Sequence, residues 1–226
     1  MGALHRRKEG RSMKWLLSTS LVLWLLSPLA MATESGPEQV VRDITDRMLV
    51  LLKEQRALYH SDPETLYRAL DELLTPVVAF DAIASSVVSA KYNRDATPEQ
   101  MQRFEGVFKR SLVEFYGKAI SQFDDSQFNI TIVVKPVDPG KLDKRRVPVD
   151  MDVTTANGTL IPLTYTMFQD DNGNWKMRNV IVNGINIGKL FRTQFDQAMQ
   201  DNNKNLQYVI DNWGAILSQS NELQSS

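Results

Sequence analysis

Three pairs of carboxylates are the first candidates for chemistry in this chain. They are Asp124-Asp125, Asp150 with Asp152, and Asp170-Asp171. Paired carboxylates can act as general acid and base, but these pairs fall in predicted turns or on the polar face of a predicted strand. Segment 170–174 resembles a calcium loop, yet no glutamate stands at the twelfth position and no helices are predicted to flank it. We therefore interpret all three pairs as turn formers or solvated side chains.

Histidine and cysteine chemistry is nearly absent from the sequence. The chain has no cysteine and two histidines, of which only His60 follows the N-terminal segment. A catalytic triad or a zinc site needs partners for such a residue. The G-x-S-x-G, H-E-x-x-H and Gly-rich phosphate-binding patterns do not occur. Thiol chemistry is thus excluded and no metal site is predicted. A small isomerase-type pocket, with one buried Asp and one Tyr, stays open as an enzyme alternative.

Residues 1–32 have the layout of a secretory signal peptide. Five Lys and Arg residues lie between positions 6 and 14, and an apolar run covers 15–26. Pro28 ends this run, and Ala30-Met31-Ala32 supplies the small residues that signal peptidase reads. The run is shorter than the about 20 apolar residues of a membrane span. We predict cleavage near Ala32, with an uncleaved anchor as the alternative and Met13 as a second possible start.

The mature chain, residues 33–226, is mildly acidic. It has 21 Lys and Arg residues against 26 Asp and Glu residues, a net charge of −5. A nucleic-acid-binding protein is expected to carry a basic patch, and adsorption to anionic lipid uses clustered Lys and Arg. The composition therefore predicts a freely soluble exported protein with no nucleic-acid partner. Because no disulfide is available, its core alone must hold it together.

The periodicity of apolar residues divides the mature chain into three regions. It is helical over about 37–119, alternates like strands over about 127–183, and is helical again over about 185–218. This order predicts a single α+β domain over 33–226. We expect a short, curved antiparallel sheet of about four strands, covered by several helices that enclose an apolar cavity.

Local signals place the boundaries of several elements. Asp62-Pro63 predicts a helix start, and Thr97-Pro98 followed by Gln100 predicts a capping box. Asn157-Gly158 predicts a hairpin turn. The consecutive apolar residues 180–182 indicate a buried stretch or a bulge in the last strand.

The predicted meander and helices carry a surplus of large apolar residues. Such residues can fill a core or can line a cavity between sheet and helices. Periodicity alone does not distinguish these two arrangements.

Three segments together resemble one known family. They are residues 66–76 (Leu66-Tyr67-Arg68 to Thr75-Pro76), 92–117 (Tyr92-Asn93-Arg94 to Phe115-Tyr116-Gly117) and 175–195 (Trp175-Lys176-Met177 to Phe191-Arg192 and Phe195). Their order and spacing resemble the MlaC family, the periplasmic phospholipid carriers of the Mla lipid-transport system, also called the toluene-tolerance family. The resemblance covers about residues 38–217.

The sequence departs from the family pattern in one place. The pattern has an Asp-containing strand followed by Glu-Gly-Val-Ser, where this chain has Asn179 and then Asn183-Gly184-Ile185-Asn186. Two acidic groups are therefore absent. If those groups serve partner docking in the family, this member is expected to dock differently.

The resemblance implies a periplasmic carrier that shuttles glycerophospholipid and maintains outer-membrane lipid asymmetry. The lipid is its cargo, no cofactor is implied, and the protein is expected to be a monomer. Its implied partners are the inner-membrane Mla ABC transporter complex and an outer-membrane lipoprotein–porin complex. A non-lipid periplasmic adaptor or chaperone-like protein is the alternative, and the isomerase-type enzyme is a further one.

We predict that the acyl tails contact residues from the inward-facing apolar stripes. These residues are Val88, Tyr92, Phe104, Phe108, Leu112, Phe115, Tyr116, Val149, Met151, Leu163, Tyr165, Met167, Val182, Ile187 and Phe191. Met151 and Met167 suit variable chains because the thioether side chain is flexible. We interpret the basic residues Lys91, Arg94, Arg145 and Arg146 as solvated surface or partner-docking groups rather than head-group contacts.

Overall fold

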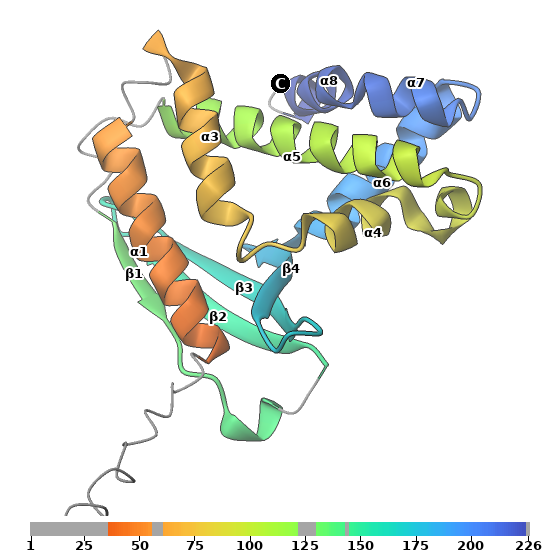
Figure 1. Cartoon of the computed structure of the whole chain (residues 1–226). Coiled ribbons are helices and arrows are strands. Elements are labelled where there is room, and N and C mark those ends of the chain that lie inside the picture. Colours follow the sequence, from red (N-terminus) through yellow and green to blue (C-terminus); the bar gives the residue numbers. More distant parts are fainter. Residues whose placement is uncertain (1–35, 56–60, 122–129, 143–144, 225–226) are drawn as a thin grey trace, which may run out of the picture. The chain divides into compact units, whose positions relative to one another are not determined.

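An antiparallel meander forms the sheet of this protein (Figure 1). The computed structural model describes residues 36–55, 61–121, 130–142 and 145–224. Its strands follow one another in the order β1-β2-β3-β4-β5, and each neighbouring pair is antiparallel. The bounds are β1 Thr131–Val134, β2 Val147–Thr154, β3 Leu160–Gln169, β4 Trp175–Val182 and β5 Ile185–Asn186.

Helices precede and follow the sheet in the chain. The helices before it are α1 Pro37–Gln55, α3 Pro63–Leu74, α4 Phe80–Asn93 and α5 Pro98–Ser121. A short 3-10 helix, η2 Pro139–Lys141, joins β1 to β2. The helices after the sheet are α6 Ile187–Asp201, α7 Leu206–Asp211 and α8 Trp213–Gln224. Among these described helices, none is long and apolar enough to cross a membrane.

The α+β prediction is confirmed, with one additional strand. The sequence predicts about four strands and a helix from Ile185, but residues Ile185–Asn186 pair with β4 as β5 before α6 begins at Ile187. Two residues are too few to show a strand period, so this pairing left no signal in the sequence. The predicted turn at Asn157-Gly158 joins β2 to β3, and Gly158 has a φ of 82° there.

The predicted helix starts are confirmed in atomic detail. Asp62 Oδ1 accepts a hydrogen bond from the Thr65 backbone N–H at 3.2 Å. The capping box is reciprocal: the Gln100 N–H donates to Thr97 Oγ1 at 3.2 Å, and the Thr97 N–H donates to Gln100 Oε1 at 3.0 Å. Each bond satisfies a backbone donor that has no partner within the helix.

Helices α4 to α8 pack on one another around an aromatic core. The centroid of the Phe104 ring lies 5.1 Å from that of Phe195 and 5.6 Å from that of Trp213, and both pairs are near edge-to-face. All three side chains are fully buried. Aromatic pairs in this geometry add about 0.5–1.5 kcal/mol each beyond the area they bury. We call the cluster that contains these residues the helical core.

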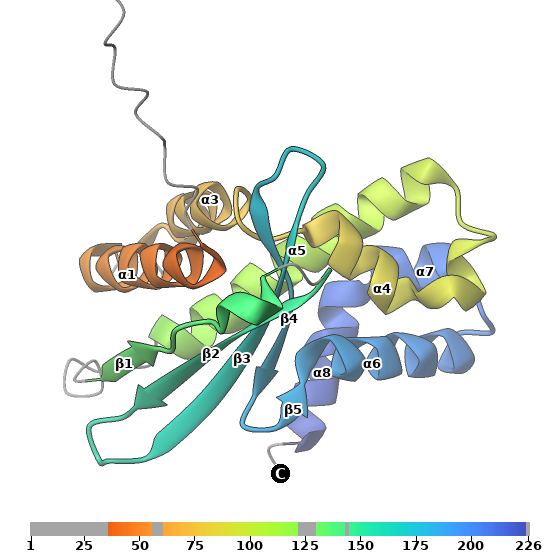
Figure 2. The ribbon, with the colours of Figure 1, turned by 90° about the horizontal axis from the view of Figure 1, so that it is seen from below.

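A second core lies between helix α1 and the sheet. Val41 of α1 packs there with Val147, Val149 and Met167, all with zero exposed surface. Thr45 Oγ1 lies 3.8 Å from the Met151 sulfur, so α1 sits directly over β2. We call this cluster the sheet core. Figure 2 shows the two helix groups separately, α1 beside α3 and α4 beside α6.

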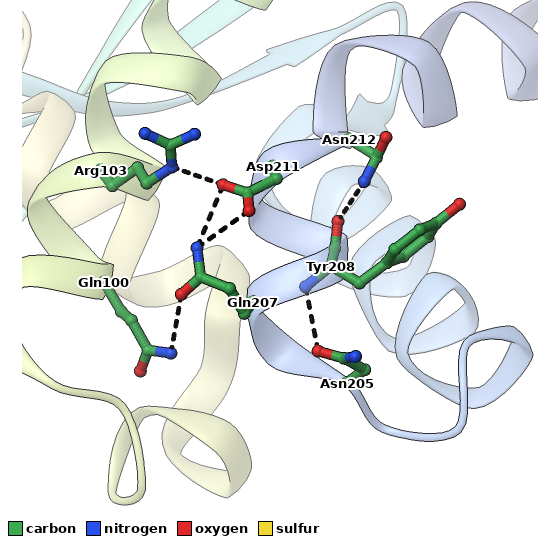
Figure 3. Close-up of polar contacts among 7 residues, drawn as sticks. All are labelled: Gln100, Arg103, Asn205, Gln207, Tyr208, Asp211 and Asn212. Atoms are coloured by element: carbon green, nitrogen blue, oxygen red, sulfur yellow. Dashed lines mark hydrogen bonds and ion pairs between the residues drawn. The ribbon is translucent and has the colours of Figure 1, made fainter.

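Polar contacts hold the short helix α7 against α5 (Figure 3). Gln100 Nε2 donates to Gln207 Oε1 at 3.1 Å, and both Gln207 and Arg103 donate to the Asp211 carboxylate. These hydrogen bonds lower the pKa of Asp211, and the bond from Gln207 has the largest effect. Asn205 caps the helix by accepting from the Tyr208 N–H. The sequence predicts one helical region here, but Asn203 and Lys204 adopt positive φ and separate α6 from α7.

Helix α4 contains a strained residue. Ser89 has φ 63° and ψ 159°, a conformation that is populated almost only by glycine. The first part of the helix ends there, and Arg192 of α6 binds its end by donating to the Ser86 carbonyl at 2.8 Å and to Ser86 Oγ at 2.7 Å. Contacts between helices therefore maintain the kink against local backbone preference.

Substitution of Ser89→Gly is expected to stabilise the protein. Glycine removes the steric cost of this conformation, at a smaller cost in unfolded-state entropy. We expect a gain of about 1 kcal/mol in the free energy of unfolding, or about 3 °C in Tm. Thermal unfolding of the purified protein measures it. The control is Ala90→Gly, at the next, helical position, which should lower Tm; a fall in Tm for both variants would contradict the strain at Ser89.

Candidate functional site

An apolar cavity of about 310 Å³ lies between the helical core and the sheet core. Its walls come from α1, α3, the segment between α3 and α4, α4, α5, β3, β4 and α6. The lining residues are Met48, Leu70, Leu74, Val78, Phe80, Ile83, Phe108, Leu112, Val113, Leu163, Tyr165, Met177, Arg178, Asn179, Val180, Val182, Ile187, Gly188 and Phe191. Nearly all of these side chains are aliphatic or aromatic, as expected of a site for an apolar ligand.

The segment between α3 and α4 fixes one end of the cavity. Met177 of β4 donates its N–H to the Val77 carbonyl at 2.7 Å and accepts from the Ala79 N–H at 2.9 Å. These bonds form a parallel bridge between Val78 and Met177. The bridge places Val78 and Phe80 against β4, and it anchors the helices that follow to the sheet.

A bulge in strand β4 lies next to this bridge. Thr166 pairs with Asn179 and Met167 pairs with Met177, so Arg178 is an extra residue without a partner on β3. A bulge redirects a side chain relative to the alternation of the strand. The sequence indicated either a buried stretch or a bulge at 180–182; the structure places the register shift a few residues earlier, and Val180 and Val182 lie in the cavity wall. Consequently an arginine lies in the wall of an otherwise apolar cavity.

Seven of the fifteen predicted tail-contact residues line the cavity. They are Phe108, Leu112, Leu163, Tyr165, Val182, Ile187 and Phe191. Phe108 and Phe191 also belong to the helical core, and their rings meet edge-to-face at 5.4 Å. These two rings therefore mark the boundary where the packed core ends and the cavity begins.

Six other predicted residues lie within the two cores. Val88, Tyr92 and Phe104 are in the helical core, and Val149, Met151 and Met167 are in the sheet core. Their stripes do face inward, but helices α6 and α1 cover them. For example, the Tyr92 ring packs 6.1 Å from Phe195 of α6. Phe115 and Tyr116 belong to α5, and their side chains lie outside the described part of the structure.

The sequence analysis missed the lining residues from α3, the α3–α4 segment and most of β4. Leu70 and Leu74 were recognisable, because they belong to the apolar stripe of their helix. Val78 and Phe80 left no such signal, because the backbone bridge to β4 brings them there. The place of Arg178 in the cavity wall depends on the bulge, and the bulge depends on how β4 pairs with β3.

Tyr165 and Arg178 are the ionisable side chains among the described residues that line the cavity. Tyr165 lies in its wall, and burial raises the pKa of this phenol to about 12, so it stays neutral at physiological pH. The carboxylates noted in the sequence lie elsewhere. Asp150 accepts from Thr164, Asp152 pairs with Lys135, and Asp170 caps its own turn, while Asp124-Asp125 fall outside the described residues. In the described ranges, no group of His, Cys, Asp or Glu side chains could hold a metal ion.

Two asparagines connect β4 to the start of α6 at the edge of the cavity. Asn179 Oδ1 accepts from the Gly188 N–H at 3.0 Å, and Asn179 Nδ2 donates to Asn186 Oδ1 at 3.2 Å. The same Asn186 oxygen caps α6 by accepting from the Lys189 N–H at 2.9 Å. A side chain at Gly188 would place its Cβ 2.7 Å from Asn179 Oδ1, so this close approach requires glycine.

The Asn179–Asn186 pair predicts the effect of restoring the acidic residue. In Asn179→Asp, a carboxylate oxygen would face Asn186 Oδ1, which the Lys189 N–H keeps as an acceptor. We expect a loss of about 1–3 kcal/mol in the free energy of unfolding near neutral pH. The unfavourable contact raises the folded-state pKa of the introduced carboxyl, so the loss should shrink as pH falls through that pKa, where the protonated acid donates to Asn186.

The double variant Asn179→Asp with Asn186→Ser supplies the control. A serine hydroxyl can donate to the carboxylate and still accept from the Lys189 N–H, so most of the lost stability should return. Urea unfolding at about pH 7 and about pH 4.5 measures both effects. Equal losses in the single and double variants would contradict the proposed role of the pair.

Comparisons with known proteins agree on one family. The family model described as MlaC protein matches residues 42–215. The toluene tolerance protein ttg2D of Pseudomonas putida is 45% identical over 203 residues, which cover 89% of this chain and 91% of that protein. A phospholipid-binding protein from Ralstonia solanacearum, solved in complex with a phospholipid, superposes with a TM-score of 0.68. This match covers 81% of the present chain and 99% of the other at 22% identity, and it shows that the two share a fold.

Proposed function

This chain belongs to the MlaC protein family, and from this membership and its cavity we propose that it is a phospholipid carrier. The acyl chains of a glycerophospholipid occupy the cavity between α5, α6 and strands β3 and β4, and the head group stays at its edge. The observation that carries the proposal is an apolar cavity bordered by the helical core, the sheet core and a third buried cluster of Leu66, Leu70 and Val113 between α3 and α5.

The energetics suit a carrier. Two acyl chains contain about 30 methylenes, and each one removed from water contributes about 0.8 kcal/mol, a total on the order of 25 kcal/mol. A lipid therefore does not cross water alone at a useful rate. Because membrane and cavity are similarly apolar, the net free energy of loading can be small, and a modest bias suffices to load or unload the cargo.

The size of the cavity indicates that loading opens it. Pockets for drug-sized ligands measure about 300–1,000 Å³, and the present cavity, at about 310 Å³, is at the lower end of that range. A two-chain phospholipid is larger than such ligands. We propose that β3 moves apart from α5 as the chains enter, while the Asn179–Asn186 contact and the β4–β5 pairing keep β4 attached to the start of α6. The helical core and the sheet core are separate clusters of buried residues, so this movement does not require either of them to open.

We propose that the carrier works in the periplasm after removal of residues 1–32. Its signal-like N-terminal sequence supports this location. It would move lipid between an outer-membrane lipoprotein–porin complex and the inner-membrane Mla ABC transporter complex, and so maintain outer-membrane asymmetry. The relative from Pseudomonas putida is named for toluene tolerance. We propose the same role for this chain, because an asymmetric outer membrane is a barrier to such solvents.

Analysis of bound lipid tests the proposal directly. The exported protein is purified from the periplasm without detergent, extracted with organic solvent, and the extract identified by mass spectrometry. We expect phospholipid in stoichiometric amount. Folded protein that contains no lipid and takes none up from vesicles would refute the carrier and favour the periplasmic adaptor.

Filling the cavity should block lipid uptake without unfolding the protein. Val180 lines the cavity and is partly accessible, so Val180→Trp places a large ring in the space for acyl chains. We expect bound phospholipid per protein to fall by about tenfold or more, the equivalent of about two lost methylene contacts. Leu160→Trp, at an exposed position of β3, is the matched control. Equal lipid content in the two variants would contradict the assignment of the cavity.

A further inference from the structure

A polar cleft adjoins the apolar cavity. Its volume is about 1310 Å³, and it is lined by the α3–α4 segment, the first part of α4, residues of α5, the end of β3 and the start of β4. The cleft and the cavity share three wall residues, Val78, Phe80 and Arg178. A molecule with an apolar part in the cavity can therefore place an attached polar part in the cleft.

Five basic residues line this cleft: Lys109, Arg145, Arg146, Lys176 and Arg178. The two lysines are engaged, because Lys109 pairs with Asp71 and Lys176 donates to the Pro76 carbonyl. The three arginines, within the described ranges, form no ion pair with a carboxylate.

Four carboxylates also line the cleft: Asp81, Glu105, Asp170 and Asp171. Asp170 is occupied by its own turn, where it accepts from the backbone N–H groups of Asn172 and Asn174 and from the Asn174 side chain. Those hydrogen bonds lower the pKa of Asp170. None of the four pairs with Arg178 in the part of the chain that the structure describes.

Arg178 occupies the junction between cleft and cavity with its donors available. The bulge in β4 turns this residue out of the strand alternation. The guanidinium carbon lies 5.6 Å from the centroid of the Phe168 ring, which forms part of the cleft wall. A cation–π contact at this distance uses none of the five N–H donors of the guanidinium, so they can bind an acceptor. A phosphate offers the matching geometry.

We propose that Arg178 binds the phosphate group of the phospholipid whose acyl chains fill the cavity, with Arg145 and Arg146 adding positive charge in the same cleft. This inference rests on the proposed carrier function and assigns its head-group site. The shared wall residues favour a phosphate that is covalently attached to an apolar cargo over a free anion or an acidic partner protein. In the sequence, Arg145 and Arg146 were interpreted as solvated or partner-docking groups, and their place in this cleft favours the head group instead.

Two cargoes with the same acyl chains separate the head-group contact from tail burial. The full-length exported protein and its Arg178→Gln variant are delipidated and offered vesicles that contain either fluorescent phosphatidylglycerol or the matching fluorescent diacylglycerol, which lacks phosphate. Transfer to protein is measured after the vesicles are removed. Arg47→Gln, at an exposed arginine of α1 outside the cleft and the cavity, is the matched control.

The native protein and Arg47→Gln should prefer the phospholipid over diacylglycerol by about tenfold or more, the value of one charge-assisted hydrogen bond. Arg178→Gln should lose most of this preference and still take up diacylglycerol as the native protein does. If Arg178→Gln takes up both cargoes and keeps the native preference for phospholipid over diacylglycerol, the head-group site is overturned, but the proposed carrier function is not. Uptake of neither cargo by the native protein would overturn the carrier itself.

A thermal-shift measurement with inorganic phosphate distinguishes a site for a lipid phosphate from a site for a free phosphate anion. A rise in Tm with inorganic phosphate that Arg178→Gln abolishes, in a protein that shows no preference for phospholipid, would assign the cleft to a free anion and overturn the proposal. Phosphate that leaves the Tm unchanged, together with the lipid preference, supports the assignment to the lipid head group.

Discussion

The edge-to-face contact of Phe108 with Phe191 is the interaction on which the rest of the arrangement depends. It lies on the side of the helical core that borders the cavity, next to the points where α4 and α6 contact β4. Helix α1 covers Val147, Val149 and Met167 of the sheet. A third buried cluster, Leu66, Leu70 and Val113, joins α3 to α5. The apolar cavity lies where residues of all three clusters meet.

Strand β4 connects the two cores and carries both the apolar and the polar parts of the site. Its later residues, Val180 and Val182, face the cavity, while the bulge at Arg178 turns a charged side chain to the edge. The bridge from Met177 to the α3–α4 segment fixes this end of the strand, and the Asn179–Asn186 pair fixes the start of α6 beside it. The guanidinium at this boundary lies within cation–π distance of Phe168 and also lines the open cleft, which lowers the cost of placing a charge there.

Much of the fold could be predicted because its signals are local. The capping box of Thr97 and Gln100, the cap at Asp62 and the hairpin at Asn157-Gly158 depend on residues only a few positions apart. The break between α6 and α7 was missed although it is also local, because Asn203 and Lys204 adopt positive φ without a glycine. Strand β5 and the bulge were not located because each depends on the strand that it pairs with.

The sequence by itself determined the fold class of the protein, its inward-facing stripes and the family it resembles, since composition, period and residue order are properties of the chain alone. Only the tertiary structure decided which inward residues are core and which are cavity wall. Val149 and Leu163 share the same alternating pattern, yet α1 covers the first and the cavity borders the second. The physical reason is that periodicity reports the side of an element a residue faces, whereas the distance to the opposing element depends on contacts between residues far apart in the chain.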